Sequence, residues 1–104
     1  MKEYRINISD LAKQDLISMV DYISNDLQEP IVAEKIVDMI IDTIFSLEEM
    51  PKRIGLVKDE RLAKKGIRSL YVKGYSVFFR INDNLKIIEI VRIIYAQRDW
   101  IALL

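Results

Sequence analysis

Apolar residues recur at steps of three and four positions through the first half of the chain, with polar residues between them. This spacing is typical of α-helices that bury one face. The first stripe comprises Ala12, Leu16, Met19, Val20, Ile23 and Leu27. The second, wider stripe comprises Ala33, Ile36, Val37, Ile40, Ile41, Ile44 and Leu47. We therefore expect two consecutive amphipathic helices.

Start and stop signals place the ends of these helices. Ser9 or Asp10 can cap the first helix, because a side-chain oxygen there accepts a hydrogen bond from a free backbone N–H. Pro30 suits the first turn of the second helix, where its missing N–H would have no partner. The pair Met50-Pro51 ends that helix. A turn of two or three residues is left between the helices, so we expect an antiparallel hairpin.

A period of two predicts strands on both sides of the helix pair. Near the N-terminus, Tyr4, Ile6 and Ile8 alternate with polar residues. Turn signals at Lys73-Gly74 and Asn82-Asp83-Asn84 divide the second half into three more strands. The expected strands cover residues 4–8, 67–72, 75–81 and 85–95. The last is apolar on both parities apart from three charged residues, which is typical of a central strand.

The resulting order is β-α-α-β-β-β, followed by a short helical turn at residues 100–104. A chain of 104 residues supports one core, so residues 1–104 are expected to form a single domain. We expect an α+β fold of two layers, in which the N-terminal strand and the antiparallel helix hairpin pack on a small antiparallel sheet. The other sheet face is then left for function. Residues 52–65 are expected to be basic and irregular.

Composition narrows the possible chemistry. The chain has no cysteine, which excludes disulfides and thiolate metal sites, and no histidine, the commonest general base and metal ligand. We expect no metal and no cofactor, so catalysis would have to use Arg, Lys, Tyr, Ser or carboxylates. The N-terminus lacks an apolar signal segment, and the most hydrophobic run, residues 36–47, is too short to span a bilayer. We therefore expect a cytoplasmic protein with no membrane partner.

The formal net charge of zero conceals a strong division of charge. Residues 1–50 carry four basic and eleven acidic side chains, a net charge of −7. Residues 51–104 carry twelve basic and five acidic side chains, a net charge of +7. Such asymmetry suggests that one side of the molecule faces a polyanion or an acidic protein segment.

Arginines are the best candidates for that contact, because the guanidinium fork binds phosphate oxygens bidentately and stays charged. If the strands pair as a meander, Arg68, Arg80, Arg92 and Arg98 converge on one concave region. The full set of candidate binding residues is Lys64, Lys65, Arg68, Arg80, Arg92, Arg98 and Trp100. Simpler roles stay open: a basic run is usually a solvated face, Trp100 can seal the core, and Arg92 can form a structural ion pair.

Several motifs together resemble the RelE/ParE toxins along essentially the whole chain. They are Tyr4-x-Ile6-x-Ile8-Ser9 leading into Ala12-x-x-Asp15-Leu16, Leu47-x-x-Met50-Pro51, Gly66-Ile67-Arg68-x-Leu70, Gly74-Tyr75-x-Val77-x-Phe79, and Ile94-Tyr95-x-x-Arg98-Asp99-Trp100-x-x-Leu103-Leu104. The resemblance implies a toxin of a type II toxin–antitoxin system, neutralised by a cognate antitoxin that masks the basic surface. Contact with operator DNA would then occur only indirectly, through the antitoxin.

Two mechanisms occur in that family. ParE-like members poison DNA gyrase, whereas RelE-like members cleave mRNA on the ribosome with basic residues and often a tyrosine. If this chain were a nuclease, the resemblance implies Arg68 and Arg98 as catalytic residues, and Tyr95 or Tyr71 offers the hydroxyl for proton transfer. Ser76 stands where RelE-like members often carry arginine, and no tyrosine follows Trp100. Together with the long helix hairpin, these departures favour the gyrase inhibitor. The alternatives are the mRNA endonuclease and an inactive regulatory module.

Overall fold

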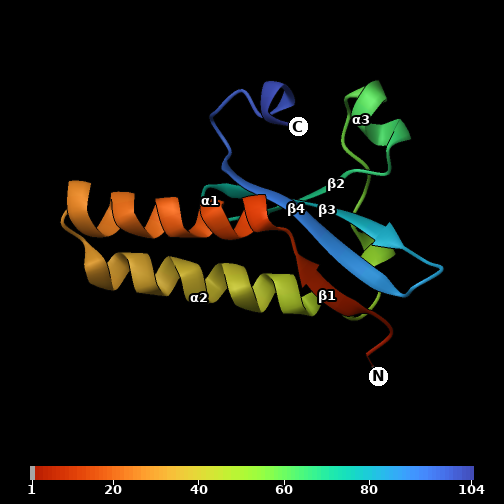
Figure 1. The fold of residues 1–104 in the computed structure, drawn as a ribbon, viewed down its shortest axis with the longest axis horizontal. Coiled ribbons are helices and arrows are strands. Elements are labelled where there is room, and N and C mark those ends of the chain that lie inside the picture. The colour runs from red at the N-terminus through yellow and green to blue at the C-terminus, as the bar shows by residue number, and fades with distance from the viewer. Residues whose placement is uncertain (1) are drawn as a thin grey trace.

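A computed structural model describes residues 2–104, and within them the chain forms a four-stranded sheet with helices on both faces. The elements are β1 (Arg5–Ile8), α1 (Asp10–Asp21), a π-helical turn (Tyr22–Asp26), α2 (Pro30–Ser46), a 3-10 turn (Pro51–Arg53), α3 (Glu60–Lys64), β2 (Arg68–Val72), β3 (Tyr75–Asn82), β4 (Ile87–Tyr95) and a 3-10 turn (Ile101–Leu103). The predicted α+β class and the helix hairpin are confirmed (Figure 1). Among the helices of residues 2–104, none has both the length and the hydrophobicity that a membrane crossing requires.

The strands lie in the order β1-β4-β3-β2. The last three strands of the chain pair antiparallel, as the turn signals predict, and β1 joins them parallel to β4. In the turn between β2 and β3, Lys73 and Gly74 have φ of 49° and 90°. Two successive positive φ values are typical of a type I′ hairpin turn, whose twist matches that of the strands. Alternation alone does not reveal the parallel pairing of β1, because a parallel partner lies far away in the sequence.

The main core lies between the helix hairpin and one face of the sheet (Figure 1). Its buried helix residues follow the expected stripes: Ala12, Met19, Ile23, Ala33, Ile40 and Ile44. Its buried strand residues are Val77, Phe79, Ile88, Ile90 and Ile93. Burial of this apolar surface is the main favourable contribution to folding.

A second, smaller core covers part of the other sheet face. It contains Leu62, Ile67, Phe78 and Ile94, and the Trp100 ring packs on Phe78 with ring centroids 5.0 Å apart. The expectation that this face is left open is therefore wrong where α3 and the C-terminal residues lie. The expectation of an irregular segment at 52–65 is also wrong for residues 60–64. There Asp59 caps α3 by accepting the Leu62 N–H, and burial of Leu62 anchors that helix.

An irregularity in β4 supplies residues to both cores. Phe78 pairs with Arg92 but Phe79 pairs with Ile90, which leaves Val91 as an extra residue in the ladder. Such a bulge shifts the alternation of side chains by one position. As a result Ile88, Ile90 and Ile93 face the main core, whereas Val91 and Ile94 contact the second core.

Beyond Ile90, β4 has no strand beside it on the β1 side, and residues around α1 supply the missing bonds. Ser9 caps α1 by accepting the Ala12 N–H, and its hydroxyl donates to the Val91 carbonyl at 2.9 Å. Asp15 of α1 accepts the Ile93 N–H at 2.9 Å. The same carboxylate accepts two hydrogen bonds from Arg92, at 2.8 Å from Nε and 2.9 Å from Nη2. These bonds raise the pKa of the Arg92 guanidinium and fix α1 against β4.

A polar cluster joins the start of the chain to the β3–β4 turn. The Tyr4 hydroxyl donates to Asp83 at 2.7 Å, and Lys52 approaches the same carboxylate at 3.1 Å. Lys86 lies 3.9 Å from Asp83 and above the Tyr4 ring. The hydrogen bond from Tyr4, followed by that from Lys52, lowers the pKa of Asp83.

Replacing Asp15 tests its role at the β4 edge. We expect Asp15→Ala to lower the free energy of unfolding by about 2–4 kcal/mol, because Arg92 and the Ile93 N–H lose their acceptor in a site mostly shielded from water. Urea denaturation measures this change. The control is Glu89→Ala, which breaks the more exposed Arg80–Glu89 pair and should cost below about 1 kcal/mol. Equal losses in the two variants would contradict a special role for Asp15.

The Asp83 cluster predicts a dependence of stability on acid. Because the pKa of Asp83 is lower in the folded chain than the value of about 3.9 in an unfolded one, its contribution is present above about pH 4. That contribution is lost as the pH falls through the folded pKa. We expect Asp83→Asn to be less stable at pH 7 and to lose stability less steeply below pH 4. Thermal denaturation at several pH values measures this, with Asp38→Asn on the exposed face of α2 as the control.

Candidate functional site

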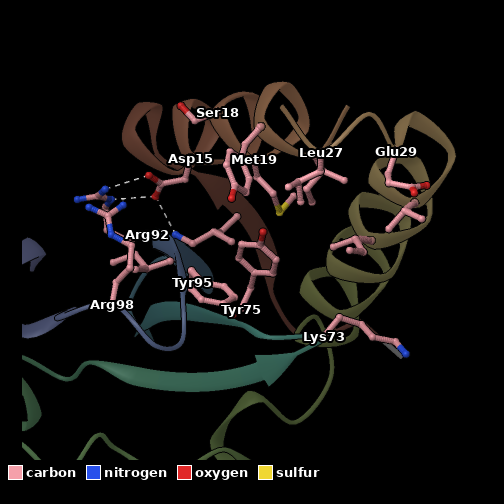
Figure 2. A pocket seen from close by; sticks show the side chains of 16 residues that line it. Asp15, Ser18, Met19, Leu27, Glu29, Lys73, Tyr75, Arg92, Tyr95 and Arg98 are labelled. Carbon is pink, nitrogen blue, oxygen red and sulfur yellow. Dashed lines mark hydrogen bonds and ion pairs between the residues drawn. The ribbon is translucent and has the colours of Figure 1, made fainter. Parts of the chain in front are cut away.

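A cleft of about 910 Å³ lies between the outer end of the helix hairpin and the ends of β3 and β4 (Figure 2). The hairpin contributes Asp15, Ser18, Met19, Tyr22, Ile23, Leu27, Glu29, Val32 and Ile36. The sheet and the turns beside it contribute Lys73, Tyr75, Arg92, Ile93, Ile94, Tyr95 and Arg98. Figure 2 shows helical side chains above the cleft and the two strand tyrosines below it. Its size is within the range of pockets that take a ligand or part of a partner chain.

Several large apolar side chains at this cleft are exposed. The exposed fractions are 52% for Tyr22, 51% for Leu27, 41% for Val32 and 43% for Tyr95. Buried Met19, Ile23 and Ile93 continue the apolar lining inward. A contiguous exposed apolar surface of this kind is typical of sites that another molecule covers.

The π-helical turn accounts for the position of Tyr22 and Leu27. The Leu27 N–H donates to the Tyr22 carbonyl at 3.1 Å, five residues back, and Gln28 then adopts a φ of 53°. The Glu29 N–H donates to the Ile23 carbonyl at 2.9 Å, which closes the connection to α2. Short π-helical segments are rare and often occur at functional sites. Here the turn presents two apolar side chains at the cleft.

The charged groups of the cleft differ in their partners. Arg92 is bound to Asp15 and also donates to the Leu103 carbonyl at 3.1 Å. Within residues 2–104, Lys73 and Arg98 have no ion-pair partner, and in Figure 2 they lie at opposite ends of the cleft. Lys73 lies in the tight β2–β3 turn, where its φ is positive. Arg98 lies in the turn that follows Tyr95. The cleft therefore combines an apolar lining with two available cations.

The candidate binding residues predicted from sequence do not form one concave region. Arg92 and Arg98 line the cleft, whereas Arg80 and Lys65 line a separate, polar depression of about 510 Å³. Arg80 pairs with Glu89 at 2.8 Å, on the sheet face away from the hairpin as expected. Lys64 lies in α3, and Arg68 donates to the Ile54 carbonyl. Trp100 packs in the second core.

The three residues that a nuclease would use are also separated. Tyr95 and Arg98 line the cleft, but Arg68 does not. Arg68 pairs with Phe79, whereas Tyr95 pairs with Tyr75 at the other end of β3, about 13 Å away along the strand. Tyr71, the other hydroxyl considered, is exposed on β2 outside the cleft. Within residues 2–104, no group of three or more carboxylate, histidine or cysteine side chains is placed to hold a metal ion.

A third tyrosine in the cleft is a poor proton acceptor. The Tyr75 ring packs edge-on against Tyr95 with centroids 5.6 Å apart. Burial, followed by the neighbouring Tyr95 and Tyr22, raises the pKa of the Tyr75 hydroxyl. A general base works best with a pKa near the working pH, so this shift is in the unfavourable direction.

Sequence reasoning missed Tyr22, Val32 and Lys73 as cleft residues. Each carried a weak signal. Tyr22 and Val32 are large apolar residues outside the core stripes, and Lys73 is the non-glycine half of a turn that needs positive φ. The sequence could not show that the β2–β3 turn and the outer end of the helix hairpin both line the same cleft.

Comparison with known proteins places the chain in a family. A family model described as the ParE toxin of the type II toxin–antitoxin system parDE matches residues 6–100. A comparison with curated proteins finds no match. The fold is similar to the chromosomal ParDE system from P. aeruginosa, with a TM-score of 0.75 and 23% identity over 93% of this chain and 100% of that chain. It is also similar to the RelBE2 toxin–antitoxin complex from Mycobacterium tuberculosis, with a TM-score of 0.63 and 19% identity over 89% of this chain and 98% of that one.

The family match covers nearly all of the described residues and agrees with the resemblance seen in the sequence. Both similar structures come from toxin–antitoxin systems and share the overall fold of this chain. The chain therefore belongs to the ParE toxin family of type II toxin–antitoxin systems.

Proposed function

We propose that this toxin is neutralised by a cognate antitoxin that covers the cleft, and that the free toxin inhibits DNA gyrase. The observation that carries the first part is the cleft itself, with four exposed apolar side chains and two cations available for pairing. An amphipathic helix fits such a surface, because its apolar stripe fills the lining while acidic residues beside the stripe pair with Lys73 and Arg98. Unmasking of the cleft would then accompany release of the toxin.

The choice of gyrase rests on two observations. The family model is that of ParE toxins, and the residues that an mRNA nuclease would need are about 13 Å apart along the sheet. A protein-binding inhibitor needs no such convergence. The second candidate, a ribosome-dependent mRNA endonuclease, is favoured only by Tyr95 and Arg98 sharing the cleft and by the fold shared with a RelBE2 complex.

Substitution in the cleft tests the antitoxin proposal. We expect Leu27→Asp to weaken binding of the cognate antitoxin by at least about 30-fold, because an apolar anchor is replaced by a charge that must lose its water. The matched control is Ile31→Asp, which introduces the same charge at an exposed apolar residue outside the cleft and should change the affinity less than about threefold. Isothermal titration calorimetry gives both affinities. Equal weakening by both variants, or no weakening by either, would contradict docking of the antitoxin in the cleft.

A supercoiling assay tests the target. Purified toxin is expected to inhibit negative supercoiling by gyrase and to trap cleaved DNA, and a stoichiometric excess of antitoxin should restore activity. Unchanged supercoiling at a large excess of toxin would argue against gyrase. Primer extension on translated mRNA separates the alternative, since cleavages in the ribosomal A site that disappear in Arg68→Ala and Arg98→Ala would indicate the endonuclease. Growth without arrest on expression of the toxin alone would instead indicate an inactive regulatory module.

A further inference from the structure

The basic side chains of residues 51–104 divide into two classes by their partners. Six are engaged within the chain: Lys52, Arg53, Arg68, Arg80, Lys86 and Arg92. Two of the others, Lys73 and Arg98, line the cleft. The remaining four are Lys58, Arg61, Lys64 and Lys65, and all are exposed with no ion-pair or hydrogen-bond partner in residues 2–104. The unengaged charge of this half is therefore concentrated around α3.

These four exposed side chains lie on or directly beside α3, and we call them the α3 ridge. In a helix, residues three and four positions apart lie on the same side, so Arg61 is flanked by Lys64 and Lys65. Lys58 lies two residues before the helix, in the bend that leads into it. Residues 57–65 also contain two anions: Asp59 caps Leu62, and Glu60 lies one turn before Lys64, so the segment carries a net charge of +2. Leu62 points to the second core, away from the ridge.

The helix that carries the ridge is held firmly. The Gly66 N–H donates to the Ala63 carbonyl at 2.9 Å, and the Ile67 N–H donates to the Leu62 carbonyl at 3.1 Å. With the φ of 81° at Gly66, these bonds make a Schellman motif, which ends the helix sharply. The Val57 N–H donates to the Ile67 carbonyl at 3.0 Å, which ties the loop before α3 to the residue that precedes β2. The ridge is thus presented on an anchored support and not on a loose loop.

The composition of the ridge favours the phosphate backbone of duplex DNA over other polyanions. Proteins that bind single strands stack bases on aromatic side chains, and residues 57–65 contain none. Protein partners are held by apolar anchors, and α3 exposes no large apolar side chain. The four cations lie within eight consecutive residues, so each can pair with a different phosphate of one stretch of duplex backbone.

We propose that the α3 ridge binds the backbone of duplex DNA without sequence preference. Backbone contacts carry no sequence information, so recognition of an operator would stay with the antitoxin. None of the ridge residues lines the cleft, and α3 stands away from the helix hairpin in Figure 1. The toxin therefore binds DNA whether or not the cleft is covered. This inference does not depend on gyrase being the target.

The test is fluorescence anisotropy of a labelled 30-base-pair duplex of random sequence, titrated with the toxin at 50 and 200 mM NaCl. Release of counterions from four phosphates predicts that the affinity falls about 150-fold between these two salt concentrations. In the triple variant Arg61→Ala/Lys64→Ala/Lys65→Ala, one cation of the ridge is left and the fall should be only about fourfold. The control is Arg5→Ala/Lys13→Ala/Lys35→Ala, which removes three exposed cations outside the ridge and should keep the steep dependence.

Three outcomes would overturn the proposal. One is the absence of binding at 50 mM NaCl. Another is an equal effect of the two triple variants on the salt dependence of DNA affinity, whether both keep the steep dependence or both lose it. The third is tighter binding to a single-stranded RNA of equal length, which would assign the ridge to another class of partner. A toxin that binds DNA through the ridge but leaves supercoiling unchanged would uphold this inference and contradict only the choice of gyrase.

Discussion

Every backbone N–H and C=O group of a buried strand needs a hydrogen-bond partner, and at β4 this requirement explains how the helix hairpin is attached to the sheet. β4 has a neighbour on the β1 side only as far as Ile90, and beyond it the Val91 carbonyl and the Ile93 N–H would be unpaired. Ser9 and Asp15 supply their partners, and an unmet group there would cost about 1–3 kcal/mol. Because Asp15 also holds Arg92, and Arg92 holds the Leu103 carbonyl, one carboxylate connects the helix hairpin, the central strand and the C-terminal turn.

The division of charge takes a different form in three dimensions from the one along the chain. Six of the twelve basic side chains of the second half are engaged in bonds within the chain, such as those of Lys52 with Asp83 and Arg80 with Glu89. What is left is gathered at two separate places, the cleft and the α3 ridge. One combines charge with exposed apolar surface, and the other is charge alone. This contrast in chemistry is the reason for assigning them to partners of different classes.

Much of the fold is visible in the sequence because local pattern and tertiary packing agree. Most residues of the helix stripes lie in the core, although Leu27 is exposed at the cleft. The Ser9 cap holds, and both β-turns occur where glycine or asparagine marks them. α3 was not visible because a five-residue helix has too few turns for a period to emerge. The second core was not predicted because its members come from α3, β3, β4 and the C-terminal residues, which are far apart in the sequence. The cleft was partly visible: Arg98 and Tyr95 were named, but the facing Tyr22 and Leu27 depend on a π-helical turn.

The extra residue in β4 has a consequence for how the length of this strand can vary. With strict alternation, Ile88, Ile90 and Arg92 would all face the main core, and a guanidinium would be buried among aliphatic side chains. The bulge at Val91 resets the alternation, so that Ile93 takes the core position and Arg92 emerges beside Asp15. Deleting Val91 itself would leave Ile90, Arg92 and Ile93 in regular alternation, so Ile93 would keep its core position without a bulge. The core therefore constrains which side of the sheet Ile88, Ile90 and Ile93 face, and it leaves the length of β4 free to change by one residue at the bulge.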